Sequence, residues 1–158
     1  FSLGEPSGKQ SERILKISRA LVNSGLKAPI RSDIRQDIWT KLIGNLAFNP
    51  LSVITEETLD ILLSKKENRN IAYSAMLEVK KIMDKLGITL NISIDQRIQG
   101  AAKVGAHNTS MLQDYKKGKK LELDAIVIAV KEIGNLLGVN TPTIDKILYE
   151  VEEKVSII

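Results

Sequence analysis

From Ser32 onward, apolar residues recur with the 3.6-residue period of an α-helix, almost to the end of the chain. Such a period gathers apolar side chains on one face of each helix, so these helices must bury their faces against one another. A capping hydroxyl followed by proline at Thr141-Pro142 predicts a helix start, while Gly87 and Gly138 stand where helices should stop. The pattern predicts a mostly α domain over residues 33–158, with helices at 33–53, 57–65, 68–86, 93–104, 110–117, 122–137 and 142–156.

The first 32 residues show a different pattern. Phe1-Ser2-Leu3-Gly4 predicts a short strand that runs into a turn, and residues 26–31 predict a second short strand. Between them, Ser11 is a suitable N-cap for a helix that ends near Ser24-Gly25. Because parallel strand pairs normally lie inside larger sheets, residues 1–32 are expected to be a β-α-β stub of a larger α/β domain. Its exposed strand edges would favour self-association.

Composition excludes several kinds of site. With 43% hydrophobic residues, 158 residues suffice for one core, but no apolar run is long enough to predict a membrane-spanning helix. The first residues do not resemble a signal segment, so a cytoplasmic protein is expected. The absence of cysteine excludes disulfides, thiolate metal sites and a cysteine nucleophile. His107 is the single histidine, so a histidine-based metal cluster is excluded too, and no metal is expected.

The net charge of +4 favours anionic partners, which are either small acids or nucleic acid. Nucleic-acid-binding proteins usually add aromatic stacking platforms or a dense basic stripe, whereas aromatic residues make up only 4% of this chain. The one dense basic stretch, Lys116 to Lys120, is interpreted as a solvated helix end or turn. No nucleic-acid or membrane partner is expected.

The expected helix at 33–53 carries a polar stripe. Its apolar residues would bury it on most sides; they are Ile38, Trp39, Leu42, Ile43, Leu46, Ala47, Phe48 and Leu51. At about 100° per residue, Lys41, Asn45, Asn49 and Ser52 fall within an arc of roughly 80°. Gly44 lies beside this arc and leaves room for something to approach. Asparagine is a poor residue for a helix interior, so the stripe suits a polar pocket, but a solvated face with an incidental Pro50 fits the spacing equally well.

A second polar segment runs from His107 to Asp114 and is followed by Glu122 and Asp124. Small polar residues ahead of Met111-Leu112 are typical of a helix N-cap. Acidic residues near a helix start are ordinary complements of the helix dipole. Considered alone, His107 is more typical of a surface histidine than of a catalyst. This segment by itself therefore predicts no site.

Considered in order along the chain, however, these motifs resemble the C-terminal part of the ketopantoate reductase (2-dehydropantoate 2-reductase) family. The matching motifs are Leu3-Gly4-Glu5-Pro6-Ser7-Gly8, Asp33-Ile34-Arg35-x-Asp37-x-Trp39-x-Lys41-Leu42, Asn45-x-x-x-Asn49-Pro50-Leu51, Ser110-Met111-x-Gln113-Asp114, Glu122-x-Asp124 and Gly138-Val139-x-Thr141-Pro142. The resemblance implies a helical domain of the 6-phosphogluconate dehydrogenase C-terminal-like type. It also implies that the β-α-β stub is the last piece of a Rossmann domain that binds NADPH through a GxGxxG turn, which these residues lack.

The resemblance further implies roles for individual residues in the reduction of 2-dehydropantoate to pantoate, on the route to pantothenate and coenzyme A. Lys41 matches the general acid that protonates the ketone oxygen. Asn45, Asn49 and Ser110 match substrate-binding residues, and Glu122 matches a glutamate between substrate and cofactor. With these matches, the polar stripe is interpreted as functional, and the isolated chain is expected to be inactive because it cannot hold NADPH.

Some positions depart from the family pattern. His107 stands where some members have a substrate-contacting asparagine, and it is retained as a substrate-binding candidate. Val127-Ile128 replaces an Asn-Gly pair, and a further family asparagine has no match between Thr55 and Leu63. These departures leave open a reductase of another 2-oxo acid. A non-catalytic helical interaction module is a third alternative, and a homodimer is a further expectation.

Overall fold

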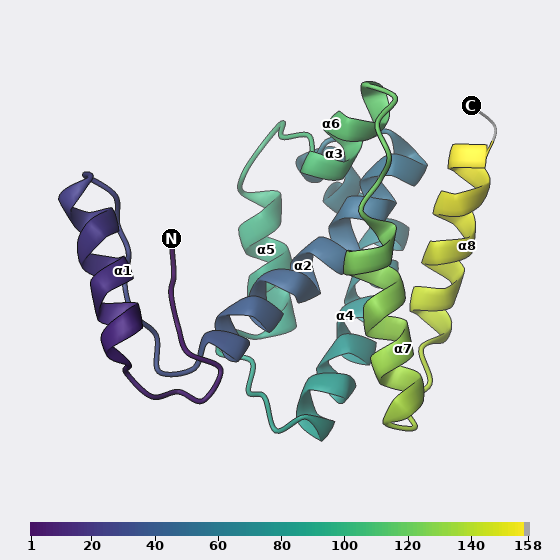
Figure 1. The fold of residues 1–158 in the computed structure, drawn as a ribbon. Helices are drawn as coiled ribbons and strands as arrows, with labels where there is room; N and C mark the ends of the chain where they lie inside the picture. Colours follow the sequence, from purple (N-terminus) through teal and green to yellow (C-terminus); the bar gives the residue numbers. More distant parts are fainter. Residues whose placement is uncertain (157–158) are drawn as a thin grey trace. The chain divides into compact units, whose positions relative to one another are not determined.

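The computed structural model describes residues 1–156 and divides the chain into two compact units, residues 1–41 and 42–158. Figure 1 shows the helices of both units. The expected domain boundary between residues 32 and 33 stays a prediction.

The first unit contains helix α1, Glu12–Asn23. Ser11 caps it as expected, accepting a hydrogen bond of 3.2 Å from the backbone N–H of Ile14. The side chain of Glu5 fastens the preceding turn, because it accepts hydrogen bonds from the Ser11 hydroxyl and from Arg13. These two donors lower the pKa of the Glu5 carboxyl.

The β-α-β prediction for this unit was wrong about the strands. Leu3 and Ile30 form one isolated parallel bridge, with hydrogen bonds from the Leu3 N–H to the Pro29 carbonyl (3.0 Å) and from the Arg31 N–H to the Leu3 carbonyl (2.7 Å). Apart from this single bridge, no strand forms within residues 1–156. Pro29 lacks an N–H to extend the ladder, and Gly4 leads directly into a turn. The expected self-association through strand edges therefore loses its structural basis.

Helix α2, Ile34–Thr55, begins in the first unit and continues into the second. The other helices of the second unit are α3 Leu59–Ser64, α4 Lys66–Lys85, α5 Ile94–Ala102, α6 Ser110–Lys116, the π-helix η1 Asp124–Ile128, α7 Ala129–Leu136 and α8 Pro142–Ser156. The predicted helices are thus confirmed to within a few residues at each end. Helix α4 packs against α3, α5, α7 and α8, and Figure 1 shows α4, α7 and α8 side by side.

The core of the second unit is built mainly from α2, α4 and α8. Its fully buried side chains include Ile43, Leu46, Leu51, Leu62, Leu63, Met76, Ile82, Met83, Leu112, Ile144 and Ile147. The apolar residues expected to bury α2 are buried except Ile38, which is 55% exposed, and Leu42, which is half-buried. Ile38 lies in the part of α2 that belongs to the first unit.

A buried carboxylate joins α4 to α8. The two oxygens of Glu78 accept hydrogen bonds from the backbone N–H groups of Thr143 (2.9 Å) and Ile144 (3.0 Å). These N–H groups lie in the first turn of α8 and have no partner within the helix. The helix start predicted from Thr141-Pro142 is therefore fixed by a residue more than 60 positions away.

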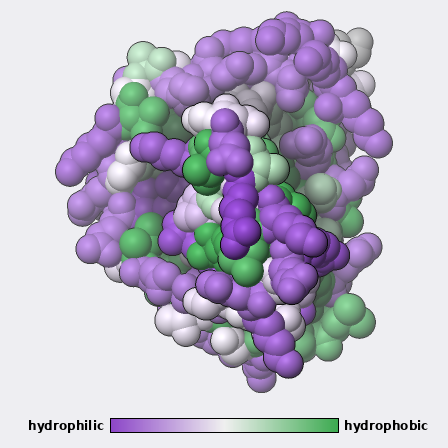
Figure 2. Space-filling model, turned by 60° about the vertical axis from the view of Figure 1, so that its left-hand side comes forward, coloured by the Kyte–Doolittle hydropathy of each residue, from purple (hydrophilic) through white to green (hydrophobic). Residues whose placement is uncertain are grey.

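The visible surface is largely polar. In Figure 2, hydrophilic side chains cover most of the face and hydrophobic ones form separate patches. No helix within residues 1–156 is both long and apolar enough to cross a membrane. In the basic stretch, Lys119 pairs with Asp114 at 3.6 Å and Lys120 pairs with Asp124 at 3.5 Å. Nearby acids thus partly neutralise this stretch.

Candidate functional site

The second unit contains a cavity of about 320 Å³ that several segments line together. Helix α2 contributes three residues, α5 contributes two, and the loop from α5 to the start of α6 contributes most of the rest. The lining residues are Asn45, Phe48, Asn49, Leu59, Arg97, Ala101, Val104, His107, Thr109 and Ser110. A volume of this size suits a small organic molecule.

The α2 wall of this cavity is polar. Asn45 is half-buried and Asn49 is 5% exposed, and they lie one helical turn apart. Neither side-chain amide forms a hydrogen bond with another group in residues 1–156. An amide both donates and accepts, so this pair can bind a ligand oxygen of either kind without adding charge.

The wall formed by the segment before α6 is joined to α2 by a buried pair of hydroxyl groups. The Ser52 hydroxyl on α2 lies 2.6 Å from that of Thr109, which caps α6 by accepting a hydrogen bond of 3.1 Å from the Leu112 N–H. The carbonyl of His107 accepts a further hydrogen bond, from the N–H of Leu59 at the start of α3. These contacts fix the backbone on both sides of Asn108. The side chains of His107 and Ser110 are exposed in the lining.

Arg97 supplies the cavity's positive charge, and the sequence did not single it out. Its guanidinium lies over Gly44, where a Cβ atom would come within 2.8 Å of Cζ, and 5.9 Å from the centre of the Phe48 ring. The gap predicted beside the polar stripe is therefore occupied by Arg97. Burial lowers the pKa of the Arg97 guanidinium, and its buried Nε has no hydrogen-bond partner. No acidic side chain among the described residues forms an ion pair with it.

The structure brings four of the six predicted site residues into this lining, namely Asn45, Asn49, His107 and Ser110. Lys41 on α2 is exposed, precedes Asn45 by four residues in the sequence and is the last residue of the first unit. Glu122 is exposed and is not part of the lining. The described residues contain no group of three or more acidic or histidine side chains that could hold a metal.

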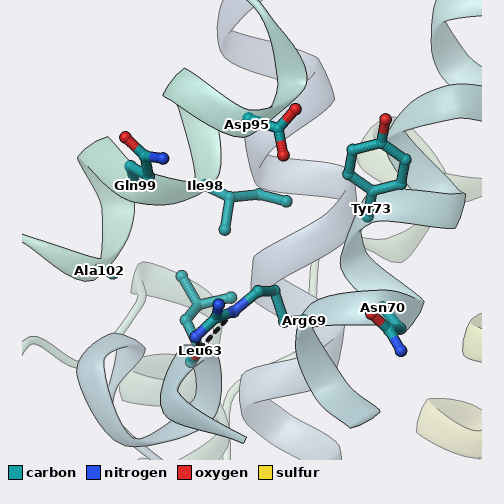
Figure 3. Close-up of a pocket in the computed structure, with 8 residues that line it drawn as sticks. All are labelled: Leu63, Arg69, Asn70, Tyr73, Asp95, Ile98, Gln99 and Ala102. Carbon is teal, nitrogen blue, oxygen red and sulfur yellow. Dashed lines mark hydrogen bonds between the residues drawn. The ribbon is translucent and has the colours of Figure 1, made fainter. Parts of the chain in front are cut away.

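A second cavity, of about 250 Å³, lies between α4 and α5 and is shown in Figure 3. Its arginine, Arg69, donates hydrogen bonds to the Leu63 carbonyl from Nε (3.0 Å) and from a terminal nitrogen (2.9 Å). Arg69 therefore satisfies a carbonyl at the end of α3. An acid, Asp95, lines the same cavity. Unlike the first cavity, this one combines an engaged cation with a carboxylate.

Comparisons with known proteins agree with the motifs. A 2-dehydropantoate 2-reductase of Mesorhizobium japonicum is 49% identical over 148 residues, which cover 94% of this chain and 45% of that protein. A crystal structure from Ralstonia solanacearum MolK2, assigned to the ketopantoate reductases, is 37% identical with a TM-score of 0.93, over 99% of this chain and 47% of that one. A D-mandelate dehydrogenase, solved as a ternary structure with NADH and anilino(oxo)acetate, shares the fold at 24% identity, with a TM-score of 0.87 over 98% of this chain and 66% of that one.

The chain spans about half the length of the curated relatives that it matches. The family model described as the C-terminal part of ketopantoate reductase PanE/ApbA matches residues 33–155. That range holds the whole cavity lining and both predicted residues outside it. The chain therefore belongs to the ketopantoate reductase PanE/ApbA C-terminal family.

Proposed function

We propose that this chain is the substrate-binding part of an NADPH-dependent reductase that converts 2-dehydropantoate to pantoate. The observation that carries the proposal is the meeting of Asn45, Asn49, His107 and Ser110 in one cavity. The two asparagines are one helical turn apart, but the other two residues follow about 60 positions later in the chain. Side chains that are neutral, polar and open to a small cavity suit a ligand with a ketone and a hydroxyl group.

In this proposal Lys41 is the proton donor. Negative charge develops on the ketone oxygen as the carbonyl is reduced, and an ammonium group stabilises that charge and transfers a proton to it. The support is the match of Lys41 to the family's catalytic lysine and its place four residues before Asn45 in the sequence. Asn45, Asn49 and Ser110 would orient the substrate, and His107 would contact it in place of the asparagine that some members have.

A nicotinamide dinucleotide, when bound, supplies the hydride for this reduction. The residues of this chain do not form a complete dinucleotide site by themselves. The sequence contains no GxGxxG turn, and the first cavity, of about 320 Å³, is far smaller than a dinucleotide requires. Glu122 is an exposed carboxylate, and its contact with the cofactor is proposed from the family match alone. NADPH as the form used, a cytoplasmic location and a homodimer belong to the proposal.

The proposal is tested with the intact protein by following NADPH oxidation with 2-dehydropantoate. Lys41→Ala should lose most of kcat, whereas Lys131→Ala, which removes a half-buried lysine on α7 that pairs with Asp145, should not. An unchanged kcat in the Lys41 variant would exclude the proton-donor role. Residues 1–158 alone are expected to show no turnover, and clear activity from them would contradict the need for a nucleotide-binding domain.

A second candidate function is reduction of a different 2-oxo acid. The observation in its favour is His107 in the cavity lining, since an imidazole is larger than the asparagine that some family members have. A panel of 2-oxo acids with different side chains, assayed on the intact protein, separates the two candidates. A kcat/KM at least about ten times higher for another acid than for 2-dehydropantoate would establish this second function.

A further inference from the structure

Arg97 is a cation without a counter-charge at the wall of the first cavity. Its side chain comes from the first half of α5, and its guanidinium packs against α2 at Gly44. Because Gly44 has no side chain, the flat guanidinium can approach the helix backbone, and the Phe48 ring flanks it one turn later. The packing fixes where the charge lies.

The lining contains no acid that could neutralise this charge. Arginine keeps its proton in proteins, so the charge persists even though burial opposes it. Taking a charge partly out of water is unfavourable unless a partner compensates. In the second cavity of the same unit, Arg69 has such a partner in the Leu63 carbonyl, whereas the Arg97 side chain has none within residues 1–156.

The surroundings of Arg97 indicate which partner it lacks. The other polar side chains of the lining are amides, hydroxyls and one imidazole, which accommodate neutral oxygens. A planar carboxylate accepts two parallel hydrogen bonds from a guanidinium and supplies one negative charge. A small monocarboxylic acid with further oxygens beside the carboxylate therefore complements the whole lining.

We infer that Arg97 binds the carboxylate of the substrate, with Gly44 providing the space in which the guanidinium lies. The inference rests on the proposed function, because it names the group that holds the acid end of the 2-oxo acid. Asn45, Asn49 and Ser110 then remain for the ketone and hydroxyl oxygens. Arg97 accordingly selects 2-oxo acids over neutral 2-oxo compounds of the same shape.

The test compares Arg97→Met with Arg69→Met and wild type in the intact protein. Each variant removes one arginine side chain that lines a cavity. Arg97 on α5 lines the first cavity, whereas Arg69 on α4 lines the second. KM for the 2-oxo acid should rise roughly 10- to 100-fold in Arg97→Met, since a hydrogen bond to a charged group is lost, and should change little in Arg69→Met. Circular dichroism and Tm check that both variants fold.

A second measurement reports on the carboxylate itself. Wild type should prefer the 2-oxo acid strongly over its methyl ester, and Arg97→Met should lose most of that preference by accepting the ester about as well as wild type does. An unchanged KM and an unchanged acid-to-ester ratio in a folded Arg97→Met enzyme would overturn the inference, while wild-type turnover would leave the proposed function intact. Absence of turnover in wild type with every 2-oxo acid would overturn both.

Discussion

Ser52 and Thr109, which are 57 positions apart in the sequence, share a buried hydrogen bond of 2.6 Å. The contact joins the last turn of α2 to the N-cap of α6. Ser52 also donates to the carbonyl of Asn49 at 2.7 Å, so one hydroxyl contacts both walls of the first cavity. The hydrogen bond between Ser52 and Thr109 thereby positions the next residue, Ser110, in the cavity lining.

Replacing Thr109 with valine should destabilise the protein and disturb the cavity. The variant loses both the cap of α6 and the partner of Ser52, which together should cost about 1–2 kcal/mol of unfolding free energy. Urea denaturation measures the loss. Thr109→Ser, which retains the hydroxyl, is the matched control and should lose clearly less. A smaller loss in Thr109→Val than in Thr109→Ser would mean that the methyl group, and not the hydroxyl, stabilises this position.

Replacing Glu78 should weaken the attachment of α8 to α4. Glu78→Ala leaves the N–H groups of Thr143 and Ile144 without their acceptor, and the expected loss is about 3 kcal/mol. Glu78→Gln should lose about half of that, because a neutral acceptor forms weaker hydrogen bonds. Glu150→Ala, which removes the partly exposed partner of Lys146 on α8, should cost under about 0.5 kcal/mol. A Glu78→Ala variant as stable as Glu150→Ala would refute the capping role.

The ion pair between Glu56 and Lys154, 2.7 Å apart, should make stability depend on pH in acid. The hydrogen bond from Lys154 lowers the pKa of the Glu56 carboxyl below its ordinary value of 4.5 in the folded state. The pair therefore contributes stability above about pH 4.5, and the contribution is lost as pH falls through the lowered pKa. Glu56→Gln should remove this part of the acid dependence, as measured by unfolding curves between pH 3 and 7. Identical pH profiles of stability for wild type and variant would show that the Glu56–Lys154 pair does not contribute to the acid dependence.

The same ion pair should also make stability depend on pH in alkali. Hydrogen bonding to Glu56 raises the pKa of the Lys154 ammonium above its ordinary value of 10.5. The contribution of the Lys154 ammonium to stability is complete below pH 10.5 and is lost as pH rises through the raised pKa. Lys154→Met should flatten the stability profile above about pH 10. A profile that falls as steeply as that of wild type would show that other groups cause the alkaline loss.

Gly44→Ala should impair substrate binding more than folding. The new methyl group would meet the Arg97 guanidinium within 2.8 Å of Cζ, and a flexible arginine side chain can move away at little cost in stability. We expect a rise in KM of roughly 10-fold with little change in Tm, since the charge is kept but displaced. Gly100→Ala on α5 is the control, because a Cβ atom there meets no other group. A KM equal to that of the control would mean that the position of the guanidinium does not matter.

Asn49→Asp tests the charge balance of the cavity with an almost unchanged shape. A carboxylate at this buried position would compete with the acidic substrate for the cavity's positive charge. KM for the 2-oxo acid should rise further than in Asn49→Ala, and the difference should shrink at lower pH as the aspartate protonates. Steady-state kinetics of both variants between pH 5 and 8 provide the comparison. A smaller effect for Asp than for Ala would contradict a role for charge.

Much of the fold was predictable because helix signals are local. The 3.6-residue period, the Ser11 cap and the Thr141-Pro142 start each depend on a few neighbouring residues, and the helices formed where these signals stand. The strands in residues 1–32 were not predictable in the same way, since a strand forms only when a partner extends the ladder. Leu3 and Ile30 meet in a single bridge.

The site was predictable only in part. Spacing alone placed Asn45 and Asn49 on one face, but their proximity to His107 and Ser110 was expected from the family resemblance. Arg97 was missed because nothing near it in the sequence distinguishes it from a solvated arginine. Its significance arises from Gly44, 53 positions earlier, and the sequence indicated only that the space beside that glycine could be filled.

The wider turn at η1 sets the register of the segment before it. In η1 the N–H of Ala129 donates to the Asp124 carbonyl five residues back, so this turn holds one residue more than a regular α-helical turn would. Deleting one residue there would leave a continuous α-helix but rotate every side chain ahead of it by about 100° around the axis. Glu122 would then face a different direction, and the cofactor contact proposed for it would require a carboxylate at another position of the chain.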